Sequence, residues 1–387
     1  MSDSEIIYLD HAAATPMDQR VMLAMQPFLS NDFYNPSSPY APAVEIRRKL
    51  ENARHRLAVC FGGKADEVVI TAGATESIAL AMTAAQGGHV VTSAIEHEAV
   101  LANARQYSHT IVPVGKCGIV SVSDIAAAIT PKTTLVSIAL ANSELGTIQP
   151  LSDIARVVEK VRRERLERHD STPIWLHTDA SQGVGQLDIS VARLGVDMLS
   201  LNAGKIYGPK QVGLLWRRGM ICLQPVILGG GQEMGLRSGT ENVAGVIGFA
   251  TALELATAHR KSEVARLSML RDQLEKSLMN HFPDMTVNGN AKKRLAGHLH
   301  VSFPGIDAER LVFMLESKGV LVATGSACAA NKQTGSATLK AIGLEEDERN
   351  GSLRFSLGRL NDEENSKRAA QYIVAVVSQE YERVRHA

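Results

Sequence analysis

Two ionisable side chains follow β-branched segments in the middle of the chain. Asp179 comes directly after the segment 174–178, and Lys205 follows a second segment at 198–201. Because parallel strands end at the same edge of a sheet, both side chains can reach one crevice. A lysine amine can form a Schiff base with an aldehyde cofactor, and a carboxylate can keep a pyridinium nitrogen protonated. Taken singly, Asp179 would be a helix N-cap and Lys205 a solvated loop lysine; together they predict a pyridoxal phosphate site.

A short turn of small residues lies upstream of this pair. The turn 72–76 reads AGATE and separates the strand-like segment 68–71 from a helical pattern. Backbone N–H groups of small residues can approach an anion, and the dipole of the following helix favours a phosphate there. Many strand-to-helix turns contain glycine only because the chain must reverse there, so this turn alone is weak evidence. Together with Asp179 and Lys205, it predicts a phosphate-binding turn.

Two further polar side chains follow strand-like segments. His97, after the segment 90–94, could stack on a planar ring and carry a proton, since the pKa of histidine lies near neutrality. Gln182, three residues after Asp179, could donate to a phenolic oxygen of the cofactor. The alternative for His97 is a surface histidine that opens the next helix, and the alternative for Gln182 is a polar loop residue.

A cysteine near the carboxyl end lies in the segment 324–331, which reads TGSACAAN. Such small residues predict a wet, mobile loop, and a reactive thiol needs exposure and a cationic neighbourhood. The alternative for Cys328 is a loop cysteine without a role. Cys60, Cys117 and Cys222 are far apart and form no C-x-x-C pair, which argues against a zinc site and a disulfide framework. We therefore expect reduced thiols and no metal.

The composition limits the classes of partner. The 387 residues include 41 basic and 41 acidic side chains, so no global field would attract nucleic acid or an anionic membrane. The first five residues lack the basic and apolar regions of a leader, and no stretch reaches the ~20 apolar residues that span a bilayer. We expect a cytoplasmic protein whose partners are small molecules or proteins.

The pattern along the chain predicts the elements that position these residues. β-branched runs at 68–70, 90–92, 135–138, 174–176 and 198–201 mostly alternate with amphipathic stretches. This alternation is typical of a mainly parallel sheet that helices cover on both faces. The polar residues after each run then lie where such sheets bind ligands.

The carboxyl-terminal third has a different pattern. A helical periodicity runs from Thr240 to about Phe282, and we expect a break near 256–261 because an unbroken helix would extend ~60 Å. The break predicts two domains, 1–257 and 258–387, with the first ~15 residues packed on the second. Beyond it, the sequence predicts strands at 298–303 and 353–356 and helices at 308–315 and 363–384, which make a smaller α+β domain.

The motifs in this order resemble those of the cysteine desulfurases, pyridoxal phosphate enzymes on the class-V aminotransferase fold. The resemblance covers nearly the whole chain, through the segments 8–16, 35–38, 73–76, 95–97, 179–182, 205–210, 237–240, 325–328 and 354–359. It implies an α/β protein of fold type I. The larger domain would contain a mainly parallel seven-stranded sheet, and the smaller α+β domain would carry the cysteine loop.

The resemblance also implies a role for each matching residue. The implied cofactor-binding residues are Ala74, Thr75, His97, Ser143, Asp179, Gln182, Asn202, Lys205 and Thr240. Thr240 would reach the phosphate of a neighbouring subunit, which implies a homodimer with shared sites. Arg354 would bind the substrate carboxylate with help from Asn35, the alternative being a surface strand arginine. Cys328, Lys205 and His97 would be the catalytic residues.

The implied reaction is the removal of sulfur from L-cysteine, which leaves L-alanine and a persulfide on Cys328. The sulfur would pass to an acceptor such as an iron–sulfur scaffold protein, for cluster assembly, tRNA thiolation or both. Three positions depart from the common family pattern. Ser143 replaces an asparagine, Asn202 replaces a serine, and Gly204 replaces a histidine. The amide of Asn202 can still donate to a phosphate, and at Gly204 a backbone N–H or a water can take the histidine's place.

Two other functions remain open from the sequence. On the same fold, the chain could be a selenocysteine lyase or an aminotransferase in which Cys328 is incidental, since transamination needs no thiol. A non-catalytic sulfur-assembly scaffold is the alternative from another class. Against the scaffold argues the joint presence of five residues, Lys205, Asp179, His97, Arg354 and Cys328.

Overall fold

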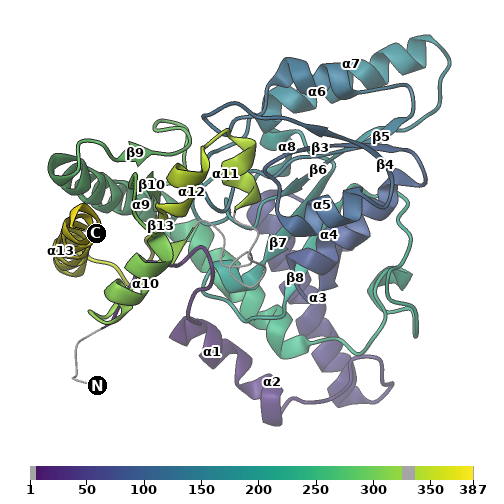
Figure 1. Cartoon of the computed structure of the whole chain (residues 1–387). Coiled ribbons are helices and arrows are strands. Elements are labelled where there is room, and N and C mark those ends of the chain that lie inside the picture. Colours follow the sequence, from purple (N-terminus) through teal and green to yellow (C-terminus); the bar gives the residue numbers. More distant parts are fainter. Residues whose placement is uncertain (1–5, 325–335, 387) are drawn as a thin grey trace.

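A computed structural model describes residues 6–324 and 336–386. A seven-stranded sheet forms its centre, in the order β2-β8-β7-β6-β5-β3-β4 (Figure 1). The strands in that order are β2 (Val68–Thr71), β8 (Gly213–Arg217), β7 (Met198–Asn202), β6 (Trp175–Asp179), β5 (Thr133–Ser137), β3 (His89–Ser93) and β4 (Ser108–Val112). All pairings are parallel except those of β8, which is antiparallel to both β2 and β7. The predicted mainly parallel seven-stranded sheet is confirmed.

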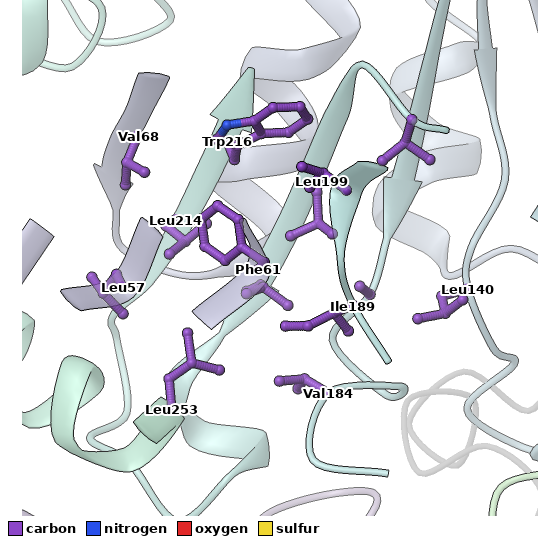
Figure 2. Packing of buried hydrophobic residues seen from close by; sticks show 14 of the residues in the cluster. Leu57, Phe61, Val68, Leu140, Val184, Ile189, Leu199, Leu214, Trp216 and Leu253 are labelled. Carbon is purple, nitrogen blue, oxygen red and sulfur yellow. The ribbon is translucent and has the colours of Figure 1, made fainter. Parts of the chain in front are cut away.

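Helices cover both faces of this sheet. They are α3 (Ala41–Phe61), α4 (Ala74–Met82), α5 (Glu98–Ala104), α6 (Val122–Ala128), α7 (Leu151–Glu167) and α8 (Val191–Leu194), with α1 (Gln19–Met25) and α2 (Pro27–Ser30) beside them. Successive strand side chains alternate between two cores, because side chains in a strand point to opposite faces. In β2, Val69 packs with α4 and α5, whereas Val68 packs with Leu57 and Phe61 of α3 (Figure 2). Burial on both faces explains why these strands read as continuous apolar runs.

A second, antiparallel sheet has the order β12-β13-β10-β9. Its strands are β12 (Ala323–Thr324), β13 (Ser352–Ser356), β10 (His298–Ser302) and β9 (Thr286–Val287). The helices of this part are α10 (Ala308–Glu316), α11 (Ala337–Ala341), α12 (Glu346–Asn350) and α13 (Glu363–Arg385). A separate apolar core lies here and includes Ile7 and Leu9 from the amino-terminal segment. That segment enters through β1 (Ile7–Tyr8), which pairs in parallel with β11 (Val320–Leu321).

One long helix connects the two cores, and here the sequence-based prediction was wrong. Helix α9 (Val243–His281) is a single helix of 39 residues with no break at 256–261. Its first half packs in the core of the large sheet through residues such as Phe249, and its second half packs in the carboxyl-terminal core through residues such as Leu270. The segment 256–261 contains neither glycine nor proline, so no residue there interrupts the helix. The long helix is stable because each of its halves packs in a different apolar core.

No described helix has the length and apolar character needed to cross a membrane. The three cysteines in the described part of the chain, Cys60, Cys117 and Cys222, are free thiols. Within the same residues, no group of three or more histidine, cysteine, aspartate or glutamate side chains could hold a metal ion.

Candidate active site

The predicted residues of the large sheet lie beyond the carboxyl ends of its strands. Asp179 ends β6, Asn202 ends β7, and His97 follows β3. Ser143 follows β5, which lies between β3 and β6. Since β7, β6, β5 and β3 are consecutive neighbours, these four side chains start from one edge of the sheet, as the sequence predicted.

The turn after β2 has the geometry of an anion site. Gly73 adopts a φ of 138°, which favours glycine, and is the N-cap of α4. The first N–H groups of a helix have no partner within that helix, so those that begin at Ala74 point toward this turn. A Cβ built on Gly73 would lie 3.9 Å from Nδ2 of Asn202, which places the amide of Asn202 beside the turn. Thr75 is exposed in the first turn of α4.

The amino-terminal segment passes over the Lys205 turn. Nζ of Lys205 donates to the carbonyl oxygens of Ala12 and Ala13, each at 2.8 Å. Nε2 of Gln182 donates to the same Ala12 oxygen at 3.1 Å, so the structure brings Gln182 and Lys205 together. Thr15 fixes the turn from the other side, because its hydroxyl donates to the Gly204 oxygen at 3.0 Å and accepts from the Tyr207 N–H at 2.8 Å. Lys205 is therefore half-buried, with its amine bonded to main-chain oxygens, and is not a solvated loop lysine.

A buried carboxyl group beside His97 was not predicted. Glu96 accepts hydrogen bonds from the hydroxyl of Ser93 at 2.6 Å and from the backbone N–H of Ala139 at 2.9 Å. Its pKa is raised to about 8, chiefly by burial and in smaller part by the negative charge of Asp179, against the lowering effect of the two hydrogen bonds. Glu96 thus joins the ends of β3 and β5 directly under the segment that carries His97. Its position at a strand end next to His97 was the signal that could have identified it.

His97 is a surface histidine that opens the next helix, which is one of the two alternatives that the sequence left open. It is the N-cap of α5, with Nδ1 accepting from the N–H of Ala99 at 3.0 Å, and it also lies at the strand edge. Asp179 caps its own turn in the same manner, since its Oδ1 accepts from the Ser181 N–H at 2.9 Å. Both side chains are thereby oriented by local hydrogen bonds. The His97 side chain is exposed, and that of Asp179 is half-buried.

Arg354 is buried and therefore is not a surface strand arginine. Only 4% of it is exposed, in the middle of β13. One terminal nitrogen donates to Oδ1 of Asp10 at 2.6 Å, and the other donates to the carbonyl oxygen of Ser143 at 3.2 Å. These contacts bring Arg354 of the second sheet to the loop after β5. Asp10 is a second residue that the sequence did not identify, and no local pattern pairs positions 344 residues apart.

Three predicted residues are not brought to the others by these contacts. Asn35 is exposed, and its Oδ1 accepts from the Ser37 N–H at 2.9 Å. Thr240 is exposed, three residues after Arg237, which binds Glu76 of α4 at 2.9 Å. Cys328 lies outside the described residues.

The comparisons with known proteins identify the family. A family model described as aminotransferase class-V matches residues 7–368. The cysteine desulfurase IscS 1 of Archaeoglobus fulgidus is 37% identical over 381 residues, which are 96% of this chain and 96% of that protein. The cysteine desulfurase IscS of Dictyoglomus turgidum is 38% identical over 93% of this chain and 91% of that protein. A solved NifS-like protein superposes with a TM-score of 0.88 at 32% identity, over 96% of this chain and 99% of that one. This chain belongs to the aminotransferase class-V family.

Pyridoxal 5′-phosphate is the cofactor of this family, and the residues at the sheet edge fit its groups. The start of α4 and the Asn202 amide offer donors to a phosphate. The carboxylate of Asp179 offers a partner for a protonated ring nitrogen, and the amine of Lys205, which here contacts main-chain oxygens, offers a partner for the aldehyde. The donor set thus matches a phosphate, a pyridine nitrogen and a carbonyl carbon.

Proposed function

We propose that this chain is a cysteine desulfurase, which takes sulfur from L-cysteine, forms L-alanine and carries the sulfur as a persulfide on Cys328. One observation carries the proposal. Lys205 and Asp179 lie at one edge of the sheet in a chain that matches cysteine desulfurases along nearly its whole length. Both fold and sequence similarity therefore support the same reaction class.

The cofactor, when bound, withdraws electrons from the Cα atom of the amino acid. Lys205 would hold it through the amine, and Asp179 would keep a proton on the ring nitrogen. Ala74, Thr75 and Asn202 would bind the phosphate, with Thr240 of a second subunit. His97 would cover one face of the ring, while Gln182 and Ser143 would lie near its phenolic oxygen.

Arg354 would bind the substrate carboxylate through its guanidinium fork, with Asn35 assisting. Its buried position favours this role. A carboxylate bound there would lose its contacts with water and gain an ion pair with the fixed guanidinium group of Arg354. The contact with Asp10 compensates the charge of Arg354 and limits its rotation. The carbonyl oxygen of Ser143 provides a second fixed contact.

Different residues would carry out the proton transfers and the sulfur transfer. The amine of Lys205 would remove the Cα proton of the substrate. Cys328, as a thiolate, would attack the substrate sulfur, so that an S–S bond forms while the C–S bond breaks and its electron pair remains on the carbon skeleton. That carbon would then take up a proton to become the methyl group of alanine. His97 would move the protons of the two thiols.

We also propose a homodimer. Three exposed apolar side chains support it, Val226, Ile227 and Leu228, on the loop that leads to Thr240, where Leu228 is 80% exposed. Burial of this loop against a second copy would bring Thr240 to the neighbouring phosphate turn. The sulfur acceptor would be a protein such as an iron–sulfur scaffold, in the cytoplasm, for cluster assembly, tRNA thiolation or both.

We further propose that the chain divides near residue 257 into a larger and a smaller domain, 1–257 and 258–387. The change of core along α9 supports this division. The packing of Ile7 and Leu9 with the carboxyl-terminal core supports the assignment of the first ~15 residues to the smaller domain.

The test is to incubate the purified, cofactor-loaded protein with L-cysteine and to measure alanine, sulfide and the visible absorbance. We expect alanine and protein-bound persulfide in equal amounts in a single turnover. Cys328→Ser should keep the cofactor but lose the persulfide, because a hydroxyl is a far poorer nucleophile toward sulfur. Lys205→Ala should lose the cofactor's near-visible absorbance.

Each alternative gives a different result in the same assay. Alanine formed by Cys328→Ser at the parental rate would exclude the role of Cys328. Turnover of selenocysteine alone indicates a selenocysteine lyase, 3-mercaptopyruvate formed with an amino-group acceptor indicates an aminotransferase, and no turnover indicates a scaffold.

A further inference from the structure

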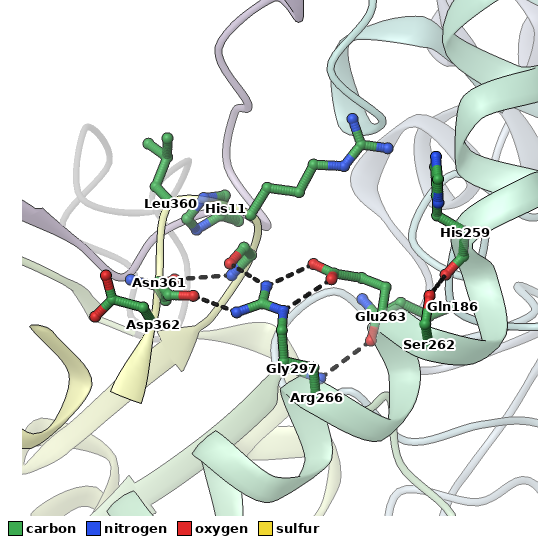
Figure 3. Close-up of polar contacts among 12 residues, drawn as sticks. His11, Gln186, His259, Ser262, Glu263, Arg266, Gly297, Leu360, Asn361 and Asp362 are labelled. Atoms are coloured by element: carbon green, nitrogen blue, oxygen red, sulfur yellow. Dashed lines mark hydrogen bonds and ion pairs between the residues drawn. The ribbon is translucent and has the colours of Figure 1, made fainter. Parts of the chain in front are cut away.

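A polar cavity lies behind Lys205, between the amino-terminal segment, the middle of α9 and the second sheet. Lys205, His11, Ser181, His298, Glu263 and His259 are among the residues that line it, whereas His97, Asp179 and Asn202 are not. It therefore shares Lys205 and Gln182 with the cofactor site and continues from them toward α9 and the second sheet. Figure 3 shows the side formed by α9, with His11, His259 and Glu263 around it.

Buried polar atoms without a hydrogen-bond partner belong to residues that line this cavity. Among the described residues, Nε2 of His11, Oγ of Ser181 and both ring nitrogens of His298 contact no donor or acceptor. These three residues are only 6%, 6% and 3% exposed. Burial lowers the pKa of His11 to about 4 and that of His298 to about 3. Each ring is therefore neutral at pH 7. His298 offers a donor and an acceptor, whereas His11 donates through Nδ1 to the Ser356 oxygen at 3.1 Å and so offers Nε2 as an acceptor.

Within residues 6–324 and 336–386, no side chain pairs with these atoms. An unpaired buried polar group costs roughly 1–3 kcal/mol, and native proteins pair nearly all of them with protein or with ordered water. The cavity has a volume of about 60 Å³, whereas one water needs roughly 10–15 Å³ on the same measure. Water is thus the partner that fits the size and the polarity of the site.

The far end of the cavity is held in place by a network on α9. Glu263 accepts from Arg266 at 2.7 Å and 2.9 Å, and Arg266 also donates to the carbonyl oxygens of Gly358 and Asn361 (Figure 3). Glu263 keeps 22% of its side chain exposed, and His259 is exposed. One end of the cavity thus meets solvent and the other meets Lys205.

We propose that this cavity binds a chain of ordered waters, held by His298, His11 and Ser181, that carries protons between Lys205 and solvent. The proposal rests on the proposed function in one respect, since Lys205 must gain and lose a proton in each turnover. His298 is then a positioning residue that acts through water. No oxidant, metal or further reactant is required, because only protons move, along the hydrogen bonds that the proposed waters form.

The first test uses the protein without cofactor. A high-resolution crystal structure should contain at least two ordered waters in the cavity, within hydrogen-bonding distance of His298, His11 and Ser181. His298→Leu, which removes both ring nitrogens at similar volume, should lose the water bound there. A dry cavity in the parent protein overturns the proposal, whether or not the protein turns over cysteine.

The second test uses the loaded enzyme. We expect His298→Leu and Ser181→Ala to lower kcat by roughly 10- to 100-fold, at most the contribution of a positioned proton-transfer group, with KM unchanged. The control His281→Leu lies at the far end of α9 and should behave as the parent. His298→Gln retains a donor and an acceptor, so it should restore most of kcat.

A third measurement, the exchange of the substrate Cα proton with solvent, tests whether a change in kcat comes from proton transfer. In deuterated water the parent should place solvent deuterium at the substrate Cα, and His298→Leu should slow that exchange. Parental kcat and parental exchange in both His298→Leu and Ser181→Ala overturn the proton route. If the parent itself forms no alanine, the proposed function fails, and the waters in the cofactor-free crystal still decide whether the cavity binds them.

Discussion

At the scale of single residues, the Glu96 carboxyl group couples the site to pH. Its pKa is raised to about 8 in the folded protein, chiefly by burial, from an ordinary value of 4.5. Between these two values the folded protein holds a proton that the unfolded chain releases. The free energy of unfolding therefore contains a contribution that is complete below pH 4.5 and is lost as the pH rises toward 8.

Glu96→Gln should remove this contribution. The amide oxygen can still accept from the Ala139 N–H, and the amide nitrogen can donate to the Ser93 hydroxyl, so the two contacts survive. We expect the melting temperature of the variant minus that of the parent to be larger at pH 8.5 than at pH 5. The free-energy change is about 1.4 kcal/mol for each unit by which folding raises the pKa.

The measurement is calorimetry of the cofactor-free proteins at both pH values. Glu98→Gln, at an exposed position in the first turn of α5, serves as the control. A difference between Glu96→Gln and the parent that stays constant from pH 5 to pH 8.5 would show that Glu96 ionises normally.

At the scale of elements, the sequence predicted the parts of the fold that have a local signature. Five of the seven central strands contain a short β-branched or apolar run, and the polar residues after these runs indicated the candidate site. Two strands were not predicted. β4 is an edge strand whose Ser108 and His109 are exposed, and β8 is antiparallel, so no crossover helix precedes it.

Other features were beyond prediction because they depend on tertiary contacts. Arg354 meets Asp10 only after two distant segments pair in the second sheet. His298 joins the Lys205 cavity only because β10 packs against the amino-terminal segment and α9. The continuity of α9 was missed for a related reason, since its support comes from two cores and not from its own periodicity.

The close approach of β8 to the phosphate turn yields a prediction for Gly213. A Cβ built there would lie 2.6 Å from the Gly73 Cα and 2.7 Å from the Leu201 oxygen, and both are backbone atoms. Gly213→Ala should therefore displace the turn and lower the free energy of unfolding by about 1–3 kcal/mol. Because the displaced turn binds the phosphate less well, the variant should also retain less cofactor. Cofactor content after dialysis and the melting temperature provide the check. Gly115→Ala, where a Cβ would touch nothing, is the control.

The Lys205 turn permits the opposite experiment. A Cβ on Gly204 would lie 3.4 Å from Oδ1 of Asn202 and 3.6 Å from Lys210, which are tolerable contacts. Asn202→Ser with Gly204→His should slow cofactor release, because one added hydrogen bond contributes roughly 0.5–1.5 kcal/mol, or about tenfold in affinity at 1.4 kcal/mol. Dissociation is measured by dialysis of parent and double variant. Faster release from the variant would mean that the place of the histidine is already filled.

At the scale of the whole molecule, four of the five buried histidines in the described residues have strongly lowered pKa values and make the fold sensitive to acid. Burial lowers the pKa of His11 and His177 to about 4 and that of His298 and His300 to about 3. The unfolded chain binds protons at these positions near pH 6.5, whereas the folded protein does not. Stability is therefore complete above pH 6.5 and falls as the pH drops toward 4, by up to about 1.4 kcal/mol per histidine and pH unit.

Denaturant unfolding at pH 7, 6 and 5 measures this dependence. We expect the free energy of unfolding to decrease steeply from pH 6.5 to pH 5, where most carboxylates are still ionised. His298→Gln should make the decrease smaller by the equivalent of one proton. An identical slope in the parent and in His298→Gln would contradict the neutral state assigned to His298.

The uninterrupted α9 has a consequence for how the molecule comes apart. The same 39-residue helix supplies buried side chains to both apolar cores. If one core unfolds, α9 loses its packing there, and the other core is destabilised as well. We therefore expect one cooperative calorimetric transition for the cofactor-free chain rather than two. By the same reasoning, no peptide bond in α9 is a point at which a protease could release two stable halves.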